Sequence, residues 1–571
     1  MRNLIFVCLL WGVASCSLTT APESIPNGLA SAPPVSDYAI ATAHPLATRA
    51  GIEILRQGGN AFDAAVAVTA CLAVVEPYAS GLGGGGFWLL HKASDRHDVM
   101  LDGRERAPLA ATRDMYLDEA GRPTRASVVG PLSAGIPGVP AALVHLSDKY
   151  GRLSLDTTLR PAIRLAREGF EVSTRYQELA GAMLENLHEA GGRTSIFLDQ
   201  GGAPEPGYVL RQAQLARVLE RIRDEGRDGF YRGEVAALLV QGVREAGGIW
   251  QLQDLAEYRV VERAPVSGSY AGMKITSAAL PSSGGIVLMQ MLNMLSLQDL
   301  EKMDPVQRTH ALVEVMRRAY RDRARYLGDT DYVEVPAARL LSMRHARNLL
   351  ADFSAKHATS SSAISEGADR QDPGREEGRN NTHFSVIDRH GNYVAATLSI
   401  NYPFGSGFMP PGTGVLLNNE MDDFSVKPGQ PNLYGLTGGA ANSIEPGKRM
   451  LSSMSPTFLD DGERVAILGT PGGSRIITMM LLAAMEFANG ADAQAMVSRP
   501  RFHHQFLPDL VQFESEAFDD PTQAALAGLG HRLQVTPRSY GDMHALIWNR
   551  STGQVTAASD PRGIGHAQVG E

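Results

Sequence analysis

The chain has 571 residues, enough to bury a large enzyme core in one domain or more. Hydrophobic residues make up 44% of the sequence and charged residues 20%, which is typical of an ordinary globular protein. A net charge of −9, without any basic block, argues against a nucleic-acid surface, so we expect no nucleic-acid partner.

An apolar run opens the chain and ends at Val13-Ala14-Ser15-Cys16. It is shorter than the roughly 20 residues that a membrane-spanning helix needs. The pattern is typical of a signal segment over residues 1–16 that closes in a lipobox, with Cys16 as the lipid-carrying N-terminus; ordinary cleavage after Ser15 is the alternative. We therefore expect a bacterial periplasmic protein that reaches the membrane only through a lipid anchor. A linker is expected over residues 17–37, directly after the signal segment.

Apolar helical patterns dominate the region 38–354. The segment from Ala61 to Val75 is almost wholly apolar, which predicts a buried helix with Cys71 as a core residue rather than a nucleophile or a disulfide partner. Further helices are predicted over residues 139–150, 159–168, 215–225, 234–246, 286–297 and 310–326. The last of these is rich in arginine from Arg317 to Arg325, which favours a solvated or ion-paired face.

A glycine-rich stretch from Gly81 to Gly86 precedes a predicted strand over residues 87–90. Nucleotide-binding fingerprints place a strand before the glycines and a helix after them, and here the order is reversed. We therefore predict a close approach of backbones in the core rather than nucleotide binding.

Residues 355–380 are polar, contain glycine and show no period, so we expect a flexible surface segment there. Directly after it, two β-rich runs flank a turn at residues 388–392, which predicts a β-hairpin. The following loop carries an acidic cluster, Glu420, Asp422 and Asp423, that we expect to face solvent or a ligand.

A predicted strand at 465–468 runs into Gly472-Gly473 and then into a predicted helix at 476–487. A tight turn at the start of a helix offers backbone N–H groups to an oxyanion. His503 and His504 follow without companion ligands at metal-site spacing, so we expect no metal.

The segment Asn381-Thr382-His383-Phe384-Ser385 resembles the self-cleavage motif Thr-x-His-x-Ser of the γ-glutamyltransferases, also called glutathione hydrolases. The resemblance implies an α+β fold, the four-layer αββα sandwich of the N-terminal-nucleophile hydrolases. It also implies a precursor that cuts itself near 380–382 into a large-subunit-like region, 38–354 with the tail 355–380, and a small-subunit-like region, 381–571. The two fragments would remain partners, and no cofactor is implied.

The resemblance also assigns roles to individual residues. It implies that the α-carboxylate of a small γ-glutamyl substrate binds Arg104, Ser452 and Ser453, and that the α-ammonium binds Asn401, Glu420 and Asp423. Ser399 falls where the family has a hydroxyl that helps to activate the nucleophile. Gly472 and Gly473 match the oxyanion-hole pair, and Gly473 also lines the substrate site. These charges are complementary to a zwitterion.

The nucleophile position departs from the family, because Asn381 has no hydroxyl. Thr382 is the fallback nucleophile, but side chains alternate along a strand, so we expect Thr382 to point away from the face that carries Asn381. Three hypotheses follow. The first is an active γ-glutamyltransferase and glutathione hydrolase, which acts on glutathione and its conjugates through a γ-glutamyl-enzyme intermediate. The second is an uncleaved, catalytically impaired protein that keeps the γ-glutamyl pocket. The third is an acylase for a larger acyl group, which the zwitterion-binding residues argue against.

Overall fold

Two large antiparallel sheets form the centre of the molecule. The structure is a computed structural model that describes residues 35–191, 195–364, 380–432 and 434–570. The first sheet contains, in order, β18 (His566–Val569), β1 (Ala39–Thr42), β9 (Thr382–Ile387), β10 (Tyr393–Ser399), β2 (Gly85–Lys92), β3 (His97–Gly103) and β6 (Val261–Arg263). The second contains β17 (Val555–Ser559), β16 (His544–Asn549), β12 (Arg464–Gly469), β11 (Thr457–Asp460), β8 (Met273–Ser277) and β7 (Val266–Tyr270).

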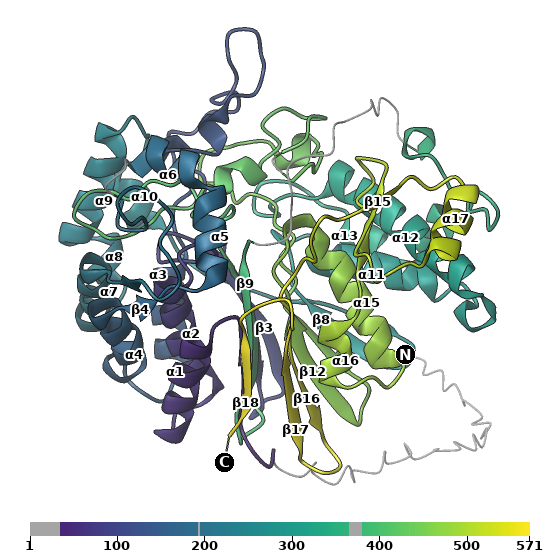
Figure 1. Cartoon of the computed structure of the whole chain (residues 1–571), viewed down its shortest axis with the longest axis horizontal. Coiled ribbons are helices and arrows are strands. Elements are labelled where there is room, and N and C mark those ends of the chain that lie inside the picture. Colours follow the sequence, from purple (N-terminus) through teal and green to yellow (C-terminus); the bar gives the residue numbers. More distant parts are fainter. Residues whose placement is uncertain (1–34, 192–194, 365–379, 433, 571) are drawn as a thin grey trace, which may run out of the picture.

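The sheets pack face to face, with helices on both outer sides (Figure 1). Strands β9 and β10 contact β12 across the interface, and Gly469 of β12 leaves room there for the ring of His383. The helices on the side of the first sheet include α1 (Pro45–Arg56), α2 (Ala61–Val75), α3 (Val139–Tyr150), α4 (Leu155–Glu168), α7 (Ala213–Glu225), α8 (Asp228–Tyr231) and α9 (Gly233–Glu245). Those on the other side include α11 (Gly284–Leu295), α12 (Pro305–Tyr326), α15 (Ile476–Ala488) and α16 (Ala493–Ser498).

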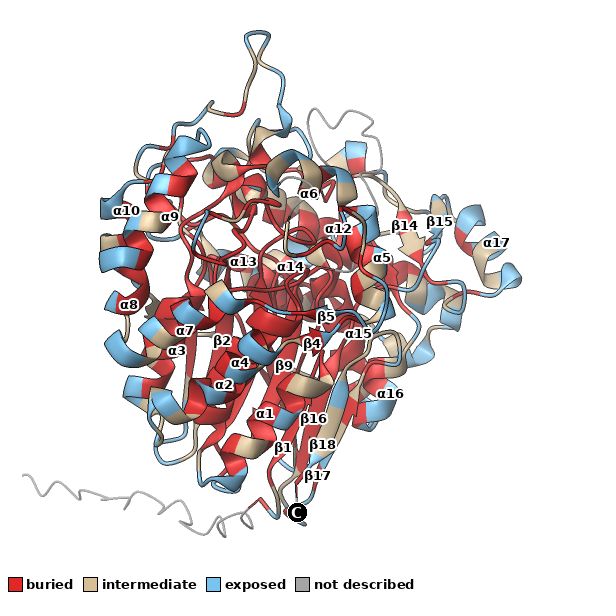
Figure 2. Ribbon diagram, turned by 60° about the vertical axis from the view of Figure 1, so that its left-hand side comes forward, coloured by how far each residue is buried: buried red, intermediate tan, exposed pale blue. Residues whose placement is uncertain are grey.

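Smaller elements surround these layers. They are α5 (Thr174–Ala182), α6 (Leu184–Gly191), α10 (Leu252–Glu257), α13 (Ala337–Leu340), α14 (Met343–Leu349), α17 (Asp520–Gly528), the pair β4 (Phe170–Glu171) and β5 (Val209–Leu210), and a small sheet of β13 (Phe502–His503), β14 (Val511–Phe513) and β15 (Leu533–Val535). Figure 2 shows that buried residues fill the sheets and the helix faces that cover them, whereas exposed residues lie on the outer helix faces. The layers therefore enclose one continuous core.

Strands from the two halves of the chain alternate in the first sheet. β9 and β10, which follow residue 380, lie between β1 and β2, which precede it. β9 pairs with β1 on one side, where Thr42 opposes Phe384, and with β10 on the other, where Leu398 opposes Thr382. The regions before and after residue 380 therefore share one core.

The main elements agree with the patterns in the sequence. The predicted hairpin is β9 and β10, and the apolar helix with Cys71 is α2, in which Cys71 is buried with a free thiol. α12 begins at Pro305, earlier than predicted, because Asp304 caps it and exchanges hydrogen bonds with Gln307. The glycine-rich stretch makes the predicted close approach: a Cβ at Gly84 would lie 2.1 Å from the Ser399 carbonyl oxygen.

Several predictions fall on or near residues that the structure does not describe. The signal segment, Cys16 and most of the linker lie outside the described residues. Within the described residues, no helix is long and apolar enough to cross a membrane. In the segment 355–380, Ser361 is buried and its hydroxyl donates to the Phe506 carbonyl at 2.6 Å, whereas residues 365–379 lie outside the described part.

Candidate active site

Asn381 lies immediately before β9, beside the Gly472-Gly473 turn. Its backbone has a φ of 77°, in the left-handed region, and the residue is 8% exposed. The Gly473 N–H donates to Asn381 Oδ1 at 3.3 Å, and the Gly472 N–H donates to the Asn380 carbonyl oxygen at 3.2 Å. Both glycines have positive φ, 141° and 57°, which side chains rarely adopt. The turn therefore directs one N–H group at residue 380 and one at residue 381.

Thr382 points to the opposite face of β9, as the alternation of side chains predicts. It is fully buried on the side of Glu76, the residue that follows α2, and its hydroxyl has no hydrogen-bond partner among the described residues. Burial raises the pKa of Glu76, and the Thr382 hydroxyl is among the groups that oppose this rise. In this structure Thr382 is thus separated from the Gly472-Gly473 turn by its own strand.

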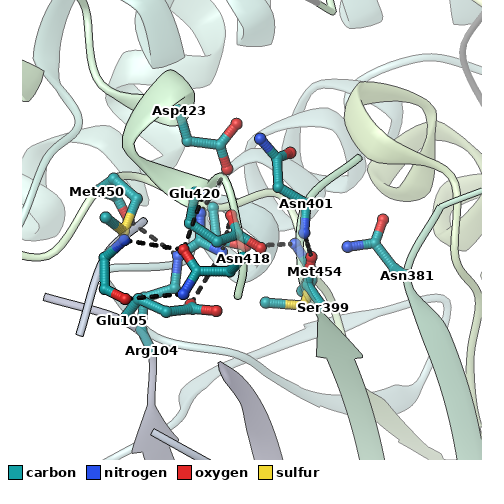
Figure 3. Close-up of polar contacts among 12 residues, drawn as sticks. Arg104, Glu105, Asn381, Ser399, Asn401, Asn418, Glu420, Asp423, Met450 and Met454 are labelled. Carbon is teal, nitrogen blue, oxygen red and sulfur yellow. Dashed lines mark hydrogen bonds and ion pairs between the residues drawn. The ribbon is translucent and has the colours of Figure 1, made fainter. Parts of the chain in front are cut away.

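A buried guanidinium and three carboxylates form the charged part of the site (Figure 3). Arg104, which follows β3 and is 1% exposed, lies 2.6 Å from Glu420 Oε2 and 3.6 Å from Glu105 Oε2. Its second terminal nitrogen donates to Asp423, and its Nε donates to the Met450 carbonyl at 3.2 Å. The residue expected to bind a carboxylate and the two expected to bind an ammonium are therefore paired with one another.

Burial raises the pKa of two of these carboxyl groups, Glu420 and Glu105. Burial raises the pKa of Glu420 to about 7; Arg104 opposes the rise and Asp423 adds to it. Burial and the neighbouring Glu420 raise the pKa of Glu105 well above its ordinary value. Neither carboxyl oxygen of Glu105 has a hydrogen-bond partner among the described residues. Glu105 is therefore a buried carboxyl group behind Arg104 that no other described residue holds by a hydrogen bond.

Ser399 and Asn401 connect the charged cluster to residue 381. The Ser399 hydroxyl accepts a hydrogen bond from the Asn401 N–H at 2.7 Å and also helps to hold down the pKa of Glu420. Asn401 Nδ2 donates to the Asn419 carbonyl at 2.9 Å, and Asn401 Oδ1 accepts from the Tyr434 hydroxyl at 2.6 Å. The protein itself therefore holds the Asn401 side chain. Tyr434 belongs to a loop without periodic pattern, so no motif in the sequence points to it.

Ser452 and Ser453 lie in the loop that precedes β11. Ser452 Oγ accepts from the Met454 N–H at 3.1 Å, and Ser453 Oγ accepts from Arg323 at 3.1 Å. Arg323 is a second residue that the sequence did not assign to the site. Of the solvated or ion-paired face predicted for its helix, the ion-paired form is confirmed, since the buried Arg317 and Arg318 pair with Glu314. Arg323 is 5% exposed and also donates to the Ser283 hydroxyl at 3.0 Å.

The predicted residues converge on one small cavity with about 20 Å³ of free space, room for about one water molecule. It is lined by Arg104, Arg323, Asn381, Asn401, Asp423, Tyr434, Leu436, Ser452, Ser453, Met454, Gly473, Ser474 and Ile476. Three further predicted residues lie just outside the lining. Glu420 pairs with Arg104, Ser399 accepts from the Asn401 N–H, and Gly472 donates to the Asn380 carbonyl oxygen. Arg104 and Asp423, which are paired with one another, both line this cavity.

The histidines near the site are hydrogen-bonded to protein groups. His503 contacts the Thr478 hydroxyl and Gln505, each at 2.8 Å, and His504 contacts Asp509 at 3.1 Å. Among the described residues, one group has a spacing that could hold a metal, His310, Glu314 and His531. Glu314 there already pairs with Arg317 and Arg318, so its charge is balanced without a metal.

Two facing sheets between helical layers, with a central strand that begins at a residue beside paired backbone N–H groups, define an N-terminal-nucleophile hydrolase. A family model described as gamma-glutamyltranspeptidase matches residues 47–570. A glutathione hydrolase proenzyme of a Pseudomonas species is 41% identical over 532 residues, 92% of this chain and 89% of the relative. The glutathione hydrolase proenzyme of Escherichia coli is 40% identical, over 93% of this chain and 91% of the relative.

Solved structures agree with this assignment. A cephalosporin acylase from Bacillus halodurans superposes with a TM-score of 0.81 at 27% identity, over 97% of this chain and 100% of that one. The γ-glutamyltranspeptidase of Helicobacter pylori gives 0.55 at 38% identity, over 58% of this chain and 97% of that one. The chain belongs to the γ-glutamyltranspeptidase family, an enzyme family that acts on γ-glutamyl small molecules and is processed into two subunits. The predicted family and fold are confirmed.

Proposed function

We propose that this chain binds the γ-glutamyl group of glutathione or its conjugates and hydrolyses the γ-glutamyl amide or transfers the group to another amine. The observation that carries the proposal is the placement of residue 381 between two kinds of group. On one side are the charges of Arg104, Glu420 and Asp423, and on the other the N–H groups of Gly472 and Gly473. The names of the curated relatives, glutathione hydrolase proenzymes, support the same substrate class.

Binding would exchange internal ion pairs for ligand ion pairs. Asp423 is the more accessible partner of Arg104, with 14% of its side chain exposed, whereas Glu420 is 1% exposed. A ligand carboxylate would therefore replace Asp423 on Arg104, and the released Asp423 would accept the ligand's ammonium together with Glu420. This exchange keeps every charge paired, which a buried site requires.

This chain departs from its family in the residue that would supply the attacking group. Asn381 has no hydroxyl, so it forms neither a γ-glutamyl ester nor the ester intermediate of self-cleavage. With Thr382 as the nucleophile, the chain would have to be cut between Asn381 and Thr382, and Thr382 would have to leave its fully buried position on the opposite face of β9. Until then, binding and the oxyanion groups alone give only slow turnover.

A second candidate function is γ-glutamyl binding without turnover by the uncleaved chain. One observation favours it: Thr382 is fully buried on the face of β9 opposite to the pocket. The family and the curated relatives support turnover instead.

One experiment separates the two candidates. The protein is recovered from its native host, its fragments are weighed by mass spectrometry, and release of an aniline from a γ-glutamyl anilide is measured for the natural chain and for Thr382→Ala. Activity that is lost in Thr382→Ala, with a fragment that begins at Thr382, establishes the cut and the nucleophile. A single intact chain without activity establishes the binding protein.

The proposed location follows from the N-terminal pattern. We infer a bacterial periplasmic protein held at the membrane by a lipid on Cys16, with the large and small fragments held together by the shared sheets if the chain is cut. The motif Val13-Ala14-Ser15-Cys16 at the end of an apolar run supports the anchor.

A further inference from the structure

Arg323 connects the small cavity to serines from two separate segments of the chain. It lies in the last turn of α12, is 5% exposed, and lines the same cavity as Arg104 and Ser453. Its Nε donates to the Ser283 hydroxyl at 3.0 Å, and one of its terminal nitrogens donates to the Ser453 hydroxyl at 3.1 Å. One planar guanidinium therefore holds the residue that precedes α11 and a residue of the loop before β11.

The hydrogen bond to Ser283 continues to the backbone of the neighbouring serine. Ser283 is fully buried, and its hydroxyl donates to the Ser452 carbonyl oxygen at 2.7 Å. The Ser283 N–H donates to the same carbonyl oxygen at 2.8 Å. Because a hydroxyl has a single hydrogen, Ser283 gives it to Ser452 and accepts from Arg323. Arg323 therefore fixes the backbone of Ser452 through Ser283 and the side chain of Ser453 directly.

This arrangement leaves the hydrogen of the Ser453 hydroxyl for a ligand. A guanidinium donates and does not accept, so Arg323 occupies a lone pair of Ser453 Oγ and not its hydrogen. Among the described residues, no acceptor for that hydrogen lies within hydrogen-bond distance. The Ser452 hydroxyl accepts from the Met454 N–H at 3.1 Å, so its hydrogen is available as well. Both serines therefore present a donor to the cavity that they line.

A carboxylate matches two such donors better than a neutral amide does. A carboxylate only accepts hydrogen bonds, whereas a carboxamide also carries an NH₂ group that must donate. A hydroxyl that accepts from a cation is polarised, which strengthens the hydrogen bond that it donates in turn. Arg104, the other guanidinium at the cavity, is already paired with Glu420 and Asp423. The polarised Ser453 hydroxyl therefore adds attraction for a carboxylate at this side of the cavity.

We propose that Arg323 is a positioning residue: it orients and polarises the Ser453 hydroxyl, and so makes the site select ligands with a carboxylate at the α position over ligands with a neutral amide there. The ligand's carboxylate accepts from Ser452 and Ser453, and Arg323 acts on it through Ser453. This inference rests on the proposed function, because it concerns recognition of the same γ-glutamyl group.

The test is calorimetric binding to the full-length chain, which does not depend on turnover. The probes are glutamate and isoglutamine, in which a neutral carboxamide replaces the α-carboxylate. The natural chain should prefer glutamate, and Arg323→Gln should lower this preference about tenfold, since hydrogen bonds to a charged acceptor are about twice as strong as neutral ones. Arg325→Gln is the matched control, because Arg325 is an exposed arginine of the same helix outside the cavity, and it should keep the full preference.

The preference separates positioning from a general loosening of the fold. A variant that merely loosens the site weakens both ligands alike and leaves their ratio unchanged. The inference is overturned if the ratio of the two affinities in Arg323→Gln equals that of the natural chain.

A double-variant comparison tests whether Arg323 acts through Ser453. Ser453→Ala should itself lower the preference for glutamate, and adding Arg323→Gln should change it further by no more than about twofold. If Arg323→Gln lowers the preference as much in the Ser453→Ala chain as in the natural chain, Arg323 acts on the ligand independently of Ser453 and its positioning role is refuted.

Arg323→Lys keeps the experiment decisive if Arg323→Gln does not fold. Lysine keeps the positive charge but lacks the planar fork that spans Ser283 and Ser453. It should therefore also lower the preference for glutamate. A full preference in Arg323→Lys would show that the charge alone is sufficient and would overturn the inference.

Glutamate binding to the natural chain separates this inference from the proposed function. If glutamate binds, and binding is lost in Arg104→Ala but the preference is unchanged in the Arg323 variants, the inference alone fails. If glutamate does not bind the natural chain at all, the proposed function fails, and the inference that rests on it fails with it.

Discussion

Replacing Asn381 by threonine should give the chain both self-cleavage and fast γ-glutamyl turnover. A threonine at this position places a hydroxyl next to the Asn380 carbonyl, whose oxygen already accepts a hydrogen bond from Gly472 at 3.2 Å. Attack by that hydroxyl on the carbonyl carbon forms an ester at residue 381 and frees its amino group. Water then hydrolyses the ester, and the freed amine can act as the base for the new N-terminal hydroxyl.

The expected gain far exceeds the losses that the substitution brings. Supplying a missing nucleophile is worth up to about 10⁶-fold, or about 8 kcal/mol. The hydrogen bond from Gly473 to Asn381 Oδ1 is lost, at a cost of about 1 kcal/mol. A β-branched residue at a φ of 77° adds about 1–3 kcal/mol of strain, which cleavage of the preceding bond relieves. Even if the lost hydrogen bond and the strain both reduced the catalytic gain in full, the rate of turnover would still rise by at least about 10³-fold.

The assay is a denaturing gel of the purified variant together with release of aniline from a γ-glutamyl anilide. Asn381→Ala is the matched control, because it removes the asparagine without adding a hydroxyl, and it should stay intact and slow. The double variant Asn381→Thr with Thr382→Ala should remain cleaved and active. If Asn381→Thr stays in one piece and turns over no faster than Asn381→Ala, the placement of residue 381 at the nucleophile position is wrong.

Three further measurements check other parts of the site. Arg104→Ala and Asp423→Ala should each lose calorimetric binding of glutamate, and unchanged affinity in either would contradict the assigned charges. Glu420 has a pKa raised to about 7 from 4.5, so its contribution to stability, about 3 kcal/mol, is full below pH 4.5 and disappears as pH rises through 7. Between pH 5 and pH 8 the melting temperature of Glu420→Gln should therefore fall less than that of the natural chain. If the two melting temperatures change in parallel with pH, the raised pKa of Glu420 is refuted. Cys16→Ala should move the protein from the detergent phase to the aqueous phase, and equal partitioning would exclude a lipid at Cys16.

Much of the fold could be predicted because its elements follow from local patterns of apolar and turn-forming residues. The apolar run of α2, the turn between β9 and β10 and the glycine turn before α15 each depend on a few neighbouring residues. The site residues assigned by resemblance also converge, since Arg104, Asn381, Ser453 and Gly473 line one cavity.

The details that sequence reasoning missed depend on contacts between distant segments. Arg104 pairs with Glu420 and Asp423, 316 and 319 residues further along the chain, and no local pattern shows that they neutralise one another. Arg323 lies in a helix with charged residues on several faces, so its burial follows only from what packs against it. Tyr434 lies in a loop without a periodic pattern, so its place in the site depends on the tertiary structure and not on a local sequence pattern.

The alternation of strands in the first sheet sets an order of events for the maturation of this protein. β9 is bonded on one flank to β1, from the first half of the chain, and on the other to β10, from the second. Separate polypeptides would each have to fold with open strand edges in place of these neighbours. Any cut ahead of residue 381 must therefore follow the assembly of the sheet, and the new chain end would then stay fixed at the pocket instead of diffusing away.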